Sequence, residues 1–103
     1  MKRSLDLNDE YLSTKEKCEK HLTASVMLAY NARNFISRLG RRKEYQKARE
    51  HLIMAENAVS NFIQGLGPNN RLWDIYEPLI LILFEQIDYD KKRIGGLEQE
   101  FII

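Results

Sequence analysis

The sequence is poor in residues that carry chemistry or covalent cross-links. Its 103 residues include one cysteine and two histidines. The single cysteine, Cys18, cannot form an internal disulfide, and no zinc-ligand spacing surrounds it, so we expect a reduced, cytoplasmic setting. His21 and His51 have no evident catalytic or metal-binding neighbours, since Glu50 and His51 are adjacent and point about 100° apart on a helix. We therefore expect no enzyme activity, no metal site and no cofactor.

The sequence also has almost no excess of positive over negative charge. Lys and Arg number 16 and Asp and Glu number 15, which leaves a net charge of +1. No overall attraction to nucleic acid or to an anionic membrane is therefore expected. Two local basic clusters remain, at residues 38–43 and 91–93. We interpret them as lying at a helix C-terminus and in loops, where cations complement the helix dipole.

No stretch is apolar for long enough to cross a membrane. The longest apolar run, residues 79–84, has charged residues close to it on both sides, whereas a spanning helix needs roughly 20 apolar residues. We expect no membrane insertion, and the N-terminus has no apolar segment of the secretory-signal kind. The run nevertheless covers every face of a helix, because successive side chains are about 100° apart. Other helices, a second copy of the chain or a client polypeptide must cover it.

Apolar residues recur at three- and four-residue steps along most of the chain, and no two strand-like segments could pair. This pattern predicts an all-α fold, an up-and-down antiparallel helical bundle of three to four helices plus a short terminal helix. We expect one domain over residues 1–103, with a flexible arm at 1–8. The predicted helices are 9–39, 43–65, 70–87 and 91–101, with Gly40 ending the first.

Several interruptions are predicted within these helices. The first helix would be about 46 Å long at 1.5 Å per residue, so we expect a break near Thr14 or residues 23–25. Pro78 lacks a backbone N–H and predicts a bend in the third helix. Residues 88–90 are expected to separate the third helix from the last. Gly95 and Gly96 should weaken the last helix by about 1 kcal/mol each, so it should need docking to stay helical.

Apolar residues outside the main stripes favour a surface for a partner. The helix at 9–39 carries several of them, and the helix at 70–87 is apolar all round in a chain too short to wrap it. Exposed apolar grooves mark partner sites, and grooves between helices receive amphipathic segments. A self-contained core explains the same residues equally well, so both interpretations stay open.

Three stretches resemble the flagellin export chaperone FliS family. Residues 26–36, Val-Met-Leu-Ala-Tyr-Asn-Ala-Arg-Asn-Phe-Ile, resemble the first core helix of that family, and the preceding residues 22–25 resemble the Thr-Ala-Ser that leads into it. Residues 42–62 are similar to the second core helix, and residues 72–77, Leu-Trp-Asp-Ile-Tyr-Glu, to the next. The resemblance spans roughly residues 22–100. Ala29-Tyr30-Asn31 stands where the family has Tyr-Asp-Gly, which indicates a divergent member or paralogue.

The resemblance implies a cytoplasmic secretion chaperone. Such a protein would hold the apolar segment of an export substrate such as flagellin, prevent premature assembly and keep the substrate ready for export. The implied partner is a protein client, with no nucleic acid. The groove residues that the resemblance suggests are Met27, Tyr30, Phe35, Trp73, Tyr76, Ile80 and Phe84.

Two alternatives remain. The pattern also looks like the IIA component of the lactose and cellobiose phosphotransferase system, whose phosphorylated histidine would lie on the third long helix. Residues 72–87 contain no histidine, so only a degenerate member would fit. The other alternative is a self-associating helical scaffold or small regulatory protein. In that case the third helix would be the interface of a homodimer.

Overall fold

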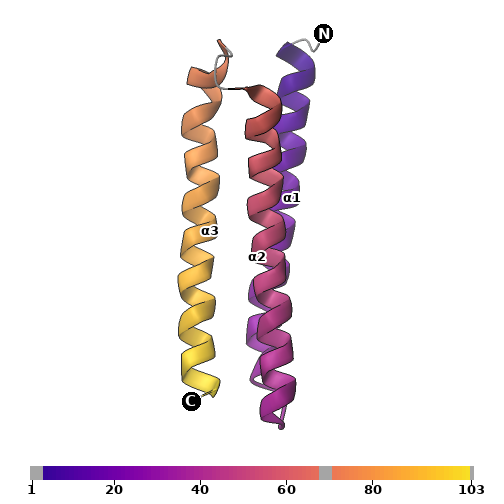
Figure 1. Cartoon of the computed structure of the whole chain (residues 1–103), viewed down its shortest axis with the longest axis vertical. Helices are drawn as coiled ribbons and strands as arrows, with labels where there is room; N and C mark the ends of the chain where they lie inside the picture. The colour runs from indigo at the N-terminus through magenta and orange to yellow at the C-terminus, as the bar shows by residue number, and fades with distance from the viewer. Residues whose placement is uncertain (1–3, 68–70, 103) are drawn as a thin grey trace.

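The computed structural model describes residues 4–67 and 71–102, with side chains for 7–67 and 71–99. It contains three long helices: α1 (Ser4–Ala32), α2 (Arg38–Leu66) and α3 (Trp73–Ile102). In Figure 1, α1 and α3 run in one direction and α2 runs in the other. No strand occurs within the described ranges. The all-α fold and the helical bundle are therefore confirmed.

The predicted short terminal helix is wrong, because α3 continues without interruption through residues 88–90. The inward positions of α3 explain this continuity. Tyr76, Ile80, Leu83, Ile87 and Ile94 are buried, and all fit one pattern of alternating three- and four-residue steps, as in a coiled-coil seam. Asp90 takes the seam position between Ile87 and Ile94 and is half-buried. In sequence the polar residues at 88–90 indicate a break between two helices, but the three- and four-residue spacing of the seam continues through them.

The first helix also differs from its predicted bounds. It begins at Ser4, within the predicted arm at 1–8, and runs through Thr14 and residues 23–25 without a break. Leu7 and Tyr11 are buried in the core, so the seam extends well toward the N-terminus. Burial of these two side chains stabilises a segment whose local sequence is polar.

The connection between α1 and α2 lies earlier than predicted. Helix α1 ends at Ala32 rather than Leu39, and Gly40 lies inside the first turn of α2 instead of ending α1. Ser37 is the N-cap of α2, and its hydroxyl accepts a 2.9 Å hydrogen bond from the Gly40 N–H. This cap satisfies one of the free N–H groups at the helix start.

Small side chains bring α1 and α2 together, whereas α3 packs through large ones. Small buried residues on α1 and α2 let the two backbones approach closely, and α3 lies farther from both. The small residues are Cys18, Ser25, Ala29, Ala32, Ala48 and Ala55. The resulting rod measures 53 × 18 × 15 Å, and its radius of gyration is 16.3 Å, against about 13 Å for a compact chain of this size.

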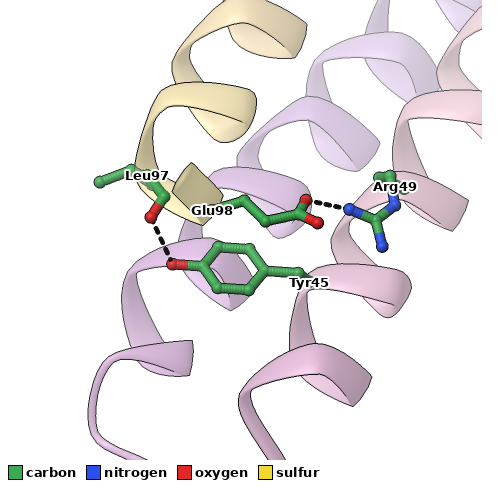
Figure 2. A network of polar contacts seen from close by, with 4 residues as sticks. All are labelled: Tyr45, Arg49, Leu97 and Glu98. Carbon is green, nitrogen blue, oxygen red and sulfur yellow. Dashed lines mark hydrogen bonds and ion pairs between the residues drawn. The ribbon is translucent and has the colours of Figure 1, made fainter. Parts of the chain in front are cut away.

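Polar contacts fasten the end of α3 to α2, as Figure 2 shows. The hydroxyl of buried Tyr45 donates a 3.1 Å hydrogen bond to the Leu97 carbonyl, and Arg49 forms an ion pair with Glu98. Lys91 and Glu56 form a second ion pair between the two helices. Together with buried Ile94, these contacts hold α3 helical across the two exposed glycines that precede Leu97.

The glycines give a test of this packing. We predict that Gly95→Ala and Gly96→Ala each stabilise the protein by about 1 kcal/mol, because alanine is the better helix former and nothing lies within 4 Å of an added Cβ. Gly40→Ala should gain no such stability, because its Cβ would lie 2.9 Å from Phe35 Cδ1 and 3.0 Å from Ser37 Oγ. Urea unfolding measures all three. Equal stabilisation by all three substitutions would contradict the close packing around Gly40.

Candidate partner groove

A groove of about 650 Å³ runs between α1 and α3. Its apolar lining includes Val26 and Met27 from α1 and Ile82 and Tyr89 from α3. The side chains of Met27, Ile82 and Tyr89 are each more than half exposed. Three large apolar side chains facing one hollow form a surface that a partner could cover.

The helical register places these side chains beside the groove. Ile75, Ile82 and Tyr89 are seven residues apart, so they form one stripe along α3 next to its buried seam. The wide separation of α3 from α1, set by the large seam residues of α3, leaves the stripe uncovered.

Carboxylates dominate the charged lining of the groove. Glu19, Glu85 and Asp90 line it, together with the single cation Arg93. Burial raises the pKa of Asp90, and nearby Arg93 opposes that shift. The local excess of negative charge favours a partner that carries cations beside its apolar face.

Tyr30 is held at the groove by two arginines. The Arg93 guanidinium donates a 2.9 Å hydrogen bond to the Tyr30 hydroxyl and lies 5.3 Å from the ring centroid. Arg33 lies 5.7 Å from the same ring. The Arg93 contacts join the end of α1 to α3 and fix the position of Arg93 in the groove lining.

The lone cysteine is a packing residue beneath this region. Cys18 is fully buried. Burial, followed by the charges of Glu19 and Asp90, raises the pKa of its thiol to about 11. The thiol is therefore neutral at physiological pH and behaves as a small apolar side chain.

Two smaller hollows lie elsewhere on the rod. A hollow of about 440 Å³ between α2 and α3 is bordered by both ion pairs that join these helices. Another of about 500 Å³ between α1 and α2 is lined largely by polar side chains, among them Ser13, Lys17 and Asn57. The α1–α3 groove is the largest of these three hollows, and three exposed large apolar side chains lie along it.

The structure separates the seven predicted groove residues. Met27 lines the α1–α3 groove, and Tyr30 lies near it under the two arginines. Tyr76 and Ile80 are enclosed in the core, where the Tyr76 ring contacts the rings of Tyr11 and Phe62.

The other three predicted residues also lie outside the groove lining. Trp73 and Phe84 are partly buried against the core. Phe35 is exposed in the connection between α1 and α2.

Ile82 and Tyr89 line the groove but are absent from the groove residues predicted from sequence. Their spacing of seven residues was a usable signal, but the predicted helix boundary at residues 88–90 placed Tyr89 in a linker. Ile82 sits in an apolar run in which every residue is large, so the run itself does not show which side faces outward.

The two histidines, far apart in sequence, meet between α1 and α2. The Nδ1 atoms of His21 and His51 are 2.9 Å apart, and the ring centroids are 5.2 Å apart. One Nδ1 donates and the other accepts, which requires at least one neutral ring. Burial, then His51 and then Lys20 lower the pKa of His21.

Other chemistry is sparse in the described part of the chain. No three potential metal ligands among His, Cys, Asp and Glu come together there. Within the same residues, no helix is both long enough and apolar enough to cross a bilayer.

Comparison with known proteins does not assign the chain to a family. No protein-family model, curated protein or solved structure matches the chain.

The histidine pair predicts a pH dependence of stability. Because the pKa of His21 is lowered in the folded protein, the unfolded chain binds more protons below about pH 6.5. The free energy of unfolding should therefore be fully retained above that pH and fall as the pH decreases below it. Urea unfolding between about pH 8 and about pH 5 measures this dependence.

His51→Gln is the matched variant for this test. It removes the neighbouring imidazole, so the stability of the variant should depend less on pH over the same range. At lower pH, protonation of Asp90 should raise the free energy of unfolding, because it relieves the cost of burying the carboxylate. This effect is opposite in sign to that of the histidine pair. A variant as pH-sensitive as the unmodified protein would contradict a role for the pair.

Proposed function

We propose that this protein is a binding protein that holds an apolar helical segment of a client polypeptide in the α1–α3 groove. The observation that carries the proposal is the exposure of Met27, Ile82 and Tyr89 along one hollow between two helices. Grooves of this kind receive amphipathic helices through apolar anchors at helical spacing.

The surface area of the rod supports this proposal. Its accessible surface is 7179 Å², whereas a folded chain of this mass typically exposes about 6,100 Å². Three helices that lie side by side cannot enclose their side chains as completely as a compact fold can. A helix lying along α1 and α3 would cover part of the excess and complete a four-helix arrangement.

The proposed mechanism is substitution of one apolar contact for another. A client segment that would bury its apolar face in an assembly buries it in this groove instead, and so remains unassembled. The carboxylates of Glu19, Glu85 and Asp90 favour a client helix with Lys or Arg beside its apolar face.

The resemblance of residues 22–100 to flagellin export chaperones extends the proposal to the class of client. In this extended form the client is an export substrate such as flagellin, and the protein acts in the cytoplasm. Self-association through the same stripe is the alternative, because an apolar face on a rod can also pair with a second copy.

The groove can be tested by calorimetry with a flagellin C-terminal peptide. We expect Ile82→Ser to weaken binding about tenfold, because it removes one buried aliphatic contact. Leu12→Ser is the matched control: both side chains are 51% exposed, but Leu12 does not line the groove. The control should bind like the unmodified protein.

Two outcomes would count against the proposal. Absence of binding at concentrations on the order of ten micromolar would remove the flagellin assignment. A stable dimer in gel filtration with light scattering that Ile82→Ser dissociates would show that the groove faces a second copy.

A further inference from the structure

The connection between α1 and α2 lies at one end of the rod (Figure 1). We call residues 33–43 the basic tip. Phe35, Ile36 and Leu39 are exposed there, and the Ile36 side chain is 97% exposed. No side chain within residues 7–67 and 71–99 covers Ile36 to any large extent.

The same segment concentrates positive charge. No Asp or Glu occurs between Glu19 and Glu44, and the basic tip carries five cations: Arg33, Arg38, Arg41, Arg42 and Lys43. Glu44, the first acid beyond the tip, forms a 3.1 Å ion pair with Lys47. The basic tip is therefore a local excess of positive charge in a chain whose net charge is +1.

The cations lie where the helix itself disfavours them. The structure places Arg38, Arg41, Arg42 and Lys43 at the start of α2, whose first turn has no acid. Our interpretation that the two basic clusters lie at a helix C-terminus and in loops is therefore wrong, because residues 91–93 also lie within α3. A helix N-terminus is the positive end of the dipole, so cations there reduce stability. An anionic partner would remove this cost.

The local structure holds the tip in a defined shape. Ser37 caps α2, and the Arg41 guanidinium donates a 3.1 Å hydrogen bond to the Phe35 carbonyl. Phe35 packs so closely over Gly40 that a Cβ there would clash with its ring. These contacts fix the backbone on both sides of Ile36 while its side chain points into solvent.

We propose that the basic tip docks on the surface of an anionic lipid bilayer. Ile36 and Leu39 enter the boundary between headgroups and acyl chains. The exposed cations Arg38, Arg42 and Lys43 contact the lipid phosphates. The rod then stands on the membrane by one end, and no helix crosses it. The α1–α3 groove lies along the side of the rod and remains open in this position.

The combination of side chains favours lipid over other anions. Nucleic acid is held by phosphate contacts together with base stacking on aromatic rings, but Ile36 and Leu39 are aliphatic and the Phe35 ring packs on Gly40. An acidic peptide would need a groove, whereas the tip is a projecting end. Exposed aliphatic side chains surrounded by cations fit a bilayer interface.

Co-flotation of the intact protein with vesicles tests the proposal. We expect binding to vesicles of phosphatidylcholine mixed with phosphatidylserine, little binding to phosphatidylcholine alone, and weaker binding at high salt. Arg42→Gln should weaken binding about fivefold, the usual effect of one interfacial cation. Ile36→Ser should weaken it about tenfold.

Matched controls lie away from the basic tip, in α1 and α3. Lys15→Gln removes an exposed cation of α1, and Ile75→Ser removes an exposed apolar side chain near the start of α3. Both should leave vesicle binding unchanged, and circular dichroism should show the same helicity for all four variants.

Two results would overturn the proposal. One is absence of binding to the phosphatidylserine vesicles. The other is binding that Arg42→Gln weakens but Ile36→Ser does not, since this would describe a general polyanion surface. Equally tight, Ile36-independent binding to duplex DNA of arbitrary sequence would then identify nucleic acid as the better partner.

Discussion

The structure depends on one contrast in side-chain size. Small residues along α1 and α2 allow these helices to pack closely, whereas α3 presents Ile80, Leu83 and Ile87 to the pair. A helix that packs through large side chains remains farther from its neighbours. The α1–α3 groove is the direct consequence of this greater separation, so one packing rule produces both the core and the candidate binding surface.

The helical class and most of each helix follow from sequence because apolar periodicity is a repeated signal. Tyr45, Leu52 and Val59 mark the seam of α2 without ambiguity. The helix ends are harder to predict, because they depend on contacts distant in sequence. Burial of Leu7 and Tyr11 extends α1 toward the N-terminus, and contacts of Tyr45 and Arg49 with the end of α3 keep that segment helical.

The candidate site was less predictable than the fold for a related reason. A run in which every residue is large and apolar identifies a helix but not its inner face, so buried Ile80 and exposed Ile82 look alike in sequence. The inner face is set by which residues neighbouring helices contact. The contact between His21 and His51, 30 positions apart, likewise depends on how α1 and α2 are aligned.

Asp90 has a consequence for the alignment of α3. A seam made entirely of isoleucine and leucine would let the helix slide by one turn or one heptad at little energetic cost. With a carboxylate between Ile87 and Ile94, sliding in either direction would bring the charge against other apolar neighbours and away from water at the groove. A single ionisable group can therefore select one alignment among several similar ones, as a lone polar residue does in many coiled coils.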